Sequence, residues 1–289
     1  MKVFFVAVFD DENKSTNNSQ ARSFERLGHE VYRYSFRDRG TALGESNRDL
    51  ELLDVVKSVN PDLVVFSKCA EISLQAITEI CESYKTCYWY MDPLTSLRDD
   101  YLQKARQCSF AVSAVPNTVP KFEAINKNTF LVYEGFDSDI DSPFEMEKQL
   151  DVSFIGSLHS QRKEMLTNLD PNVANITGAF GTNHAKAVSA SKININVSTS
   201  GGASDRVFKV LAAGGFLLST DWVGREEMFS DGEHLVIYSD KKDLQEKITH
   251  YLNNKDERDR IALNGLNAVQ KYSRDEWAKQ IILISKGLD

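Results

Sequence analysis

Two successive series of short apolar runs, each alternating with amphipathic stretches, constrain the fold of this chain more than any other feature. The first series of apolar runs covers Lys2–Phe9, His29–Ser35, Asp62–Ser67, Thr86–Met91, Phe110–Ala114 and Thr129–Tyr133. Stretches with helical spacing lie between them, over Ser19–Leu27, Asn47–Val59, Ile72–Tyr84, Ser96–Gln107 and Val119–Asn126. Strands that are apolar throughout and alternate with helices form a parallel sheet covered on both faces. The first half of the chain therefore predicts one Rossmann-like domain.

Local signals set several helix ends in this first domain. Gly28 follows the first helical stretch, where a C-cap glycine is expected. Asn47 has the side chain of a good N-cap for the second, and Asn60 followed by Pro61 ends that helix. These signals favour helices of ordinary length between the strands.

The acidic, proline-containing stretch Phe136–Gln149 interrupts the rhythm and is typical of an interdomain linker, with a hinge expected near residues 138–150. The second series then has apolar runs over Asp151–Ile155, Lys192–Val197, Phe216–Thr220 and His234–Tyr238, and helical stretches over Asp205–Ala213, Lys242–Asn253, Glu257–Tyr272 and Arg274–Lys286. We predict domains at residues 1–140 and 150–273, with the helix at 274–289 crossing back to the first. Because ligands bind outside the carboxyl ends of parallel strands, we expect a cleft between the two domains to hold the active site.

Composition makes several classes of function less favoured. The chain has 34 Lys and Arg against 42 Asp and Glu, a formal net charge of −8, which disfavours nucleic-acid phosphates as generic partners. Its apolar runs are all shorter than the ~18 residues of a membrane span, and the N-terminal run is interpreted as a first strand and not as a signal peptide. The four cysteines form no C-x-x-C pair and are expected to be reduced core residues. A cytoplasmic location fits these features.

Four motifs in the second half carry a resemblance to a known family: DVSFIGSLHSQRKEML, SKININVS, ASDRVFKVLAAGGFLLST and DGEHLVIYSDKKDLQEKITHYLNN. In this order and spacing they resemble the C-terminal domain of GT-B glycosyltransferases, most closely the spore-maturation CgeB-like group, over about residues 151–275. The resemblance implies an α/β GT-B fold, in which two Rossmann-like domains face each other across a cleft. It also implies transfer of a sugar from a nucleotide-sugar, with a UDP-sugar expected, to an acceptor hydroxyl. The donor is a substrate, and no further cofactor is expected.

The donor side of this reaction is predicted in the second domain. Gly156 and Ser157 end its first strand, where a small residue lets a diphosphate approach the backbone, and Arg162 lies about one turn further on. A small-residue loop precedes the helix at Asp205, and amides at a helix N-terminus favour phosphate. The loop and the first helical turn supply the remaining candidates: Ser200, Gly201, Gly202, Ser204, Arg206 and Lys209. A tight turn with surface cations is the alternative interpretation.

One position departs from the pattern of the resembled family. That family commonly has R-x-F-E, whose glutamate binds the ribose hydroxyls, whereas this chain has Arg206-Val207-Phe208-Lys209. A cation therefore stands where a carboxylate acceptor is expected. The E-x7-E pair of many retaining enzymes is also absent, because Gly201 and Lys209 occupy its spacing.

The acceptor side and a general base are predicted in the first domain. Inverting transfer needs a base for the acceptor proton, and carboxylates at strand ends suit that role. Asp92, which follows the apolar run at residue 86, is the first candidate, and Asp10 after the first run is the second. A turn or helix-capping function is the alternative for both. The five histidines have no metal-ligand spacing, and Asp137-x-Asp139 is expected to be solvated in the linker, so the chemistry is predicted to be independent of metal.

Two other functions stay open at this point. A related GT-B enzyme could epimerise a nucleotide-sugar without an acceptor, and it would need acid and base groups on both sides of the sugar. A non-catalytic module for sugar nucleotides or glycans is the other alternative, favoured by Lys209. Among acceptors, a glycan, a protein, a small metabolite and a modified DNA base all remain candidates.

Overall fold

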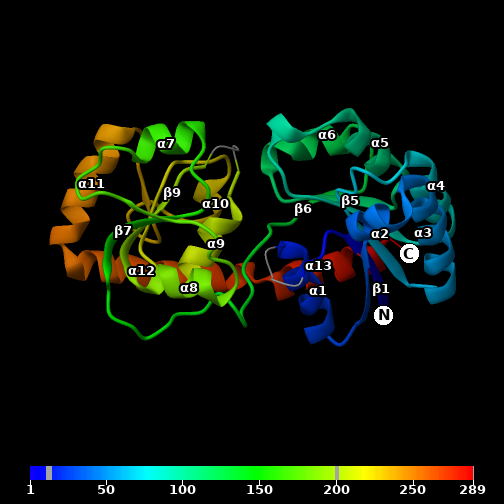
Figure 1. The fold of residues 1–289 in the computed structure, drawn as a ribbon, viewed down its shortest axis with the longest axis horizontal. Helices are drawn as coiled ribbons and strands as arrows, with labels where there is room; N and C mark the ends of the chain where they lie inside the picture. The colour runs from blue at the N-terminus through cyan, green and yellow to red at the C-terminus, as the bar shows by residue number, and fades with distance from the viewer. Residues whose placement is uncertain (11–14, 199–201, 289) are drawn as a thin grey trace. The chain divides into compact units, whose positions relative to one another are not determined.

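The structure, a computed structural model, describes residues 1–10, 15–198 and 202–288, and it divides into two compact units. Unit 1 comprises Met1–Glu134 together with Arg274–Asp289, and unit 2 comprises Gly135–Ser273. Each unit is an α/β domain built on one parallel sheet (Figure 1).

Unit 1 contains a six-stranded parallel sheet in the order β2-β1-β3-β4-β5-β6. Its strands are β1 (Lys2–Ala7), β2 (Glu30–Ser35), β3 (Leu63–Ser67), β4 (Thr86–Tyr90), β5 (Phe110–Ser113) and β6 (Thr129–Leu131). The chain reverses its direction of travel across the sheet between β1 and β3, because β2 lies on one side of β1 and all later strands on the other. Such a switch point is where open α/β sheets bind their ligands.

Helices cover both faces of this sheet, whose strands β3, β4 and β5 are buried at every residue. They are α1 (Thr16–Arg26), α2 (Phe36–Leu43), α3 (Glu45–Val59), α4 (Leu74–Ser83), α5 (Asp99–Gln107), α6 (Val119–Glu123) and α13 (Arg274–Gly287), with short 3₁₀ turns η1 (Leu94–Ser96) and η2 (Pro116–Thr118). Alternate residues of β1 enter two separate cores: Phe4 and Val6 pack with side chains of α3 to α6, and Val3 and Phe5 pack with those of α1 and α13. This alternation is the period-two geometry of a strand.

The C-terminal helix α13 is part of unit 1, although the whole of unit 2 precedes it in the chain. It packs against α1, as the red and blue helices in Figure 1 show. Its Trp277 ring lies 5.2 Å from Phe24, 5.3 Å from Trp89 and 6.4 Å from Phe5, measured between centroids. Aromatic side chains at these separations bury a large apolar area. Trp277 therefore anchors α13 to the first sheet.

Unit 2 repeats the topology of unit 1 with one strand fewer. Its five-stranded parallel sheet has the order β11-β10-β9-β7-β8. The strands are β7 (Leu150–Ile155), β8 (Ala174–Ile176), β9 (Ser191–Asn196), β10 (Leu217–Ser219) and β11 (Val236–Ile237). The switch point of this sheet lies between β7 and β9, so the loops after these two strands are where a ligand is expected.

The helices of unit 2 follow its strands in turn. They are α7 (Ser160–Leu166), α8 (Thr182–Ser189), α9 (Asp205–Ala212), α10 (Arg225–Met228), α11 (Lys241–Asn253) and α12 (Lys255–Val269), followed by the 3₁₀ turn η3 (Gln270–Tyr272). Leu244 and Ile248 of α11 pack with Phe154 and Ile195 of the sheet in one core. Gly214 ends the α9 segment at φ +70°, a left-handed conformation that glycine adopts readily.

Four sequence-based expectations need correction. The stretch expected as a solvated linker begins with packed residues: Asp137 is fully buried, and only Asp139 of that pair is exposed. A methyl group on Gly135 would lie 2.1 Å from the carbonyl oxygen of Tyr272, so the backbone of Gly135 packs directly against the backbone of Tyr272. Asn47 is not a cap, because α3 starts earlier, at Glu45. Helix α2 and strand β8 were not predicted at all.

Candidate functional site

At the switch point of unit 2, the side chain of Arg206 packs directly against the backbone of Gly156. Gly156 directly follows β7 and has a φ of +145°, which side chains rarely allow. A methyl group there would lie 2.6 Å from Nη2 of Arg206. The positive φ favours glycine at this position, and the Arg206 guanidinium, which comes from the first turn of α9, occupies the space that a side chain would fill.

Three neutral groups hold the guanidinium of Arg206. Its Nε donates to the carbonyl oxygen of Ile155 at 2.8 Å, and its Nη1 donates to Oδ1 of Asn196 at 2.9 Å. The ring of Phe154 faces its Cζ at 4.5 Å. No ion pair joins Arg206 to a carboxylate within the described part of the chain. Burial, and after it the charge of Arg162, lowers the pKa of Arg206 to about 10, so the group is still charged at neutral pH.

A second guanidinium lies on the same phenylalanine. The Cζ of Arg162 in α7 is 5.6 Å from the Phe154 ring, and its Nη1 contacts the Ser157 carbonyl oxygen at 3.3 Å and Nε2 of His159 at 3.2 Å. Its Nε is buried and has no hydrogen-bond partner in the residues that the structure covers. Burial lowers the pKa of Arg162. Two cations with neutral partners make this edge of the sheet a good place for an anion.

The helix N-terminus beside these arginines is held by the last residues of β9. Ser204 precedes α9, and its Oγ lies 3.1 Å from Oδ1 of Asn196, the same oxygen that accepts from Arg206. Gly202 is buried, and its carbonyl oxygen accepts from Oγ of Ser198 at 3.1 Å. Of the predicted loop, Ser200 and Gly201 lie outside the described residues. Asn196 was not predicted as a site residue, because β9 has the sequence SKININ and its other polar residues, Asn194 among them, give Asn196 no distinguishing signal.

Lys209 lies one turn after the arginine and is already neutralised. Its Nζ is 2.5 Å from Oδ2 of Asp205, an i,i+4 pair on α9. His184 of α8 is buried, its Nδ1 has no partner among the residues described, and its pKa falls to about 3, first because of burial and then because of the Lys209 charge. A carboxylate therefore still lies at this face of α9, at Asp205 instead of residue 209.

A pocket of about 470 Å³ opens at the carboxyl ends of β9 and β10. Its lining includes Ser198 after β9, Thr220 after β10 and Glu164 of α7; Gln161, Met165, Val197 and Lys241 complete it. A mixed polar and apolar pocket of this volume is typical of small-molecule sites.

In unit 1 the carboxyl ends of β3 and β4 bring two charged groups together. Asp92 follows β4, and its Oδ2 accepts a hydrogen bond from Nζ of Lys68 at 2.8 Å, with both side chains about one-third exposed. Glu71 is occupied by Arg37, which it contacts at 3.0 Å. Asp10 has a local structural role, because its Oδ2 accepts from the Ser15 amide at 2.6 Å and holds the start of α1.

Metal-binding and membrane-spanning features are both absent from the described residues. In residues 1–10, 15–198 and 202–288, no cluster of three or more His, Cys, Asp or Glu side chains has the arrangement of a metal site. None of the helices in these ranges has the length and apolar character needed to cross a membrane.

Comparison with known protein families identifies a domain that includes this site. Residues 140–282 match the protein family described as Glycosyl transferase-like. This segment is a glycosyl transferase-like domain. A search of curated proteins found no match to the sequence.

Solved structures agree on the fold of the whole chain. Anabaena HepE in complex with UDP-glucose is 12% identical, with a TM-score of 0.74 over 99% of this chain and 100% of HepE. Sucrose-phosphate synthase from Thermosynechococcus elongatus is 10% identical, with a TM-score of 0.75 over 100% of this chain and 99% of its own. A putative UDP-N-acetylglucosamine 2-epimerase from Listeria monocytogenes is 12% identical, with a TM-score of 0.62 over 99% and 96% of the two chains. At such identities the likeness shows the GT-B fold. With the Glycosyl transferase-like domain at residues 140–282 set in this fold, the chain is a glycosyltransferase.

Proposed function

We propose that this glycosyltransferase uses a UDP-sugar as donor and that the switch point of unit 2 binds its diphosphate. The observation that carries the proposal is the pair Arg206 and Arg162, two guanidiniums on one phenylalanine ring whose described partners are all neutral. A diphosphate supplies the missing negative charge, and the amides at the start of α9 add to its stabilisation. HepE, which shares the fold, has been solved with UDP and with UDP-glucose.

The nucleoside of the donor fits the neighbouring pocket in size and chemistry. Thr220 and Gln161 offer polar groups, while Val197 and Met165 offer apolar surface to a base and a ribose. Asp205, held by Lys209, is the carboxylate that we propose for a ribose hydroxyl in place of the glutamate common in the resembled family.

The proposed chemistry is an inverting transfer with Asp92 as general base. The acceptor hydroxyl gives its proton to the Asp92 carboxylate, and its oxygen forms a bond to the anomeric carbon of the donor. The bond from that carbon to the diphosphate oxygen breaks, and the electron pair leaves with UDP. Arg206 and Arg162 stabilise the charge that develops there, as a metal ion does in other enzymes. We therefore keep metal independence as part of the proposal.

Three finer predictions stay with this proposal. The family relationship that we propose remains the CgeB-like group, on the motifs of residues 151–275. The location remains the cytoplasm. The acceptor remains a glycan, a protein, a metabolite or a modified DNA base.

An epimerase is the second candidate, since one structure of this fold is a putative UDP-N-acetylglucosamine 2-epimerase. Product analysis separates the candidates: the protein is incubated with UDP-glucose or UDP-N-acetylglucosamine, with glycerol as a simple acceptor, and the products are identified by NMR. Transfer gives UDP together with a glycoside or free sugar. An epimerised nucleotide-sugar without UDP release would contradict the proposal in favour of the epimerase, and unchanged donors that nevertheless bind would favour a binding module.

A further inference from the structure

The turn after β3 has a backbone conformation that ordinary side chains disfavour. Lys68 and Cys69 are consecutive residues with φ values of +58° and +52°, and neither is glycine. Left-handed conformations at non-glycine residues are uncommon, and they persist only where surrounding contacts enforce them. Something in unit 1 must therefore hold this turn.

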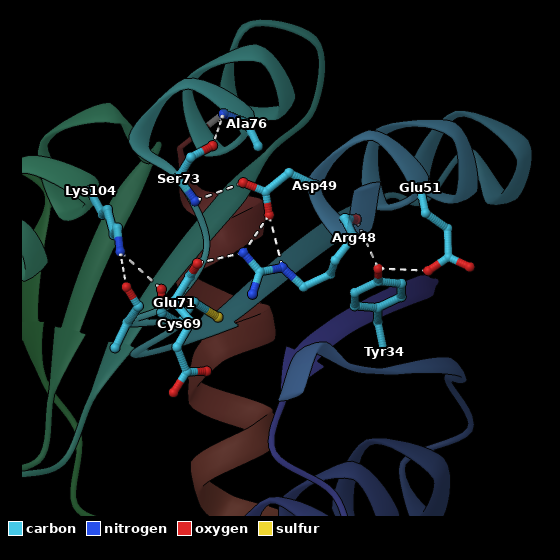
Figure 2. Close-up of polar contacts among 10 residues, drawn as sticks. Tyr34, Arg48, Asp49, Glu51, Cys69, Glu71, Ser73, Ala76 and Lys104 are labelled. Atoms are coloured by element: carbon cyan, nitrogen blue, oxygen red, sulfur yellow. Dashed lines mark hydrogen bonds and ion pairs between the residues drawn. The ribbon is translucent and has the colours of Figure 1, made fainter. Parts of the chain in front are cut away.

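Two cations hold the turn through three successive backbone carbonyls (Figure 2). Nζ of Lys104 donates to the carbonyl oxygens of Cys69 at 3.0 Å and Ala70 at 2.8 Å. Nη2 of Arg48 donates to the carbonyl oxygen of Glu71. We call this arrangement, Arg48 and Lys104 with the carbonyls of residues 69–71, the carbonyl clamp.

Both cations of the carbonyl clamp are buried, which is costly for a charged group. The exposed fraction is 1% for Arg48 and 3% for Lys104, and burial lowers the pKa of Lys104. Arg48 is balanced by Asp49, which its Nε and Nη2 contact at 2.9 and 2.7 Å. Among the residues that the structure describes, Lys104 pairs with the more exposed Asp100, at 3.6 Å. An apolar side chain would fill such a core position at lower cost, so the charge is explained by the carbonyls that it binds.

The same turn places the side chain of Lys68 beside Asp92, the proposed base. The Lys68 amide donates to the carbonyl oxygen of Trp89 at 3.0 Å, and the Lys68 carbonyl oxygen accepts from the Tyr88 hydroxyl at 2.7 Å. The backbone of Lys68 is thereby tied to β4, the strand that Asp92 follows, and its ammonium lies 2.8 Å from the Asp92 carboxylate. The carbonyls of residues 69–71 point toward Arg48 and Lys104, and the Lys68 ammonium lies on Asp92. Both placements therefore depend on the backbone conformation of this one turn.

We propose that Arg48 and Lys104 are positioning residues for glycosyl transfer. By fixing the turn, the carbonyl clamp keeps the Lys68 ammonium on Asp92 and so orients the carboxylate that receives the acceptor proton. The inference rests on the proposed function, because it takes Asp92 as the base. Neither cation reaches the reacting atoms, and both act through the turn.

The test is a double-mutant cycle with Lys104→Met and Asp92→Asn. UDP release from UDP-glucose with glycerol as acceptor gives kcat and KM, and calorimetry gives the affinity for UDP. Lys104→Met should lower kcat by about 10²-fold, the loss that displacing a catalytic group by about 1 Å can cause. The affinity for UDP should stay as in the wild type, since its site lies in unit 2. In the Asp92→Asn background, Lys104→Met should lower kcat by no more than about twofold further, because the group that it positions is already inactive.

Leu52→Ala is the matched control, because Leu52 is buried in the same core and its aliphatic side chain has no donor for the turn carbonyls. It should lower the melting temperature and leave kcat per folded molecule unchanged. Lys104→Gln keeps an N–H donor for one carbonyl and gives the same measurement at smaller amplitude if the Met variant does not fold.

The outcomes separate the two levels of the inference. Wild-type kcat in Lys104→Met, or a full 10²-fold further loss on top of Asp92→Asn, would overturn the carbonyl clamp as a positioning device while Asp92 keeps its assignment. Wild-type kcat in Asp92→Asn would overturn the proposed base, and the clamp inference would fail with it.

Discussion

Asp92, the general base that we propose, is a carboxylate placed just after the end of a strand. Several acidic residues follow strands of unit 1, and Asp92 meets the ammonium of Lys68 at the carboxyl edge of the sheet. Asp10, by comparison, uses a carboxylate oxygen to accept from the amide of Ser15. The two candidates should therefore respond differently to the same substitution.

Asp92→Asn should lower kcat by about 10²- to 10⁴-fold, the usual contribution of a positioned general base, because an amide cannot accept the acceptor proton. The affinity for UDP should not change. Asp10→Asn is the control: it should lower the melting temperature and keep turnover per folded molecule. The base assignment is wrong if Asp92→Asn retains near-normal turnover. A large loss of kcat in Asp10→Asn, with the fold and the affinity for UDP kept, would move the assignment to Asp10.

His184 gives the second prediction at this scale, on stability against pH. Its pKa is about 3 in the folded protein because it is buried, compared with about 6.5 for an exposed histidine. Below pH 6.5 the unfolded chain binds a proton that the folded chain excludes, so acidification from pH 6.5 toward 3 lowers the free energy of unfolding. Between pH 7 and pH 5 the loss should be about 2 kcal/mol.

Urea unfolding at both pH values measures this loss. The variant His184→Gln should lack it, whereas His250→Gln, which changes an exposed histidine paired with Glu257, should keep it. Equal acid sensitivity in the wild type and His184→Gln would show that this imidazole does not carry the effect.

Among the elements, α13 has a weak amphipathic signal but a decisive contact. Its sequence shows a helix that begins at Arg274, and only the structure shows that Trp277 packs among Phe5, Phe24 and Trp89 of unit 1. Helix α13 thereby makes the first unit depend on the last residues of the chain.

Trp277→Ala should lower the free energy of unfolding of unit 1 by about 3–5 kcal/mol, the cost of removing a large buried aromatic side chain. Leu283→Ala on the same helix is the control, since Leu283 is exposed and its loss should cost little. Denaturant unfolding followed by tryptophan fluorescence measures both. Equal stabilities of the two variants would be incompatible with α13 as a core element of unit 1.

The elements also show where sequence patterns stop being informative. Continuous apolar runs such as LVVFS predicted the buried strands well, because only strands covered on both faces have that pattern. Strand β8, with the sequence ANI, has three residues and lies at the sheet edge, so it has no such pattern. Helix α2 contains Gly40 and few buried side chains, and its packing on α3 is a tertiary effect. The acidic stretch at Asp137 misled because local composition does not reveal burial.

At the scale of the whole molecule, one topology is used twice. Both sheets have a switch point between their first and third strands, and the charged candidates gather at the loops that leave these strands. Gly156 and Arg206 could be predicted as site residues because they flank such loops in the sequence. Asn196, Phe154 and the buried cations Arg48 and Lys104 could not, since their importance comes from contacts between residues far apart in the chain.

The most direct test of the central claim is a calorimetric titration of UDP into the wild type, Arg206→Ala and Arg260→Ala. Arg260 is an exposed arginine of α12 in the same unit, so its loss removes the same charge without touching the switch point. Arg206→Ala should weaken UDP binding by about 1.5–3 kcal/mol, the range for hydrogen bonds to a charged group, and Arg260→Ala should bind as the wild type does. Wild-type affinity in Arg206→Ala, or an equal loss in both variants, would contradict a diphosphate site at this arginine.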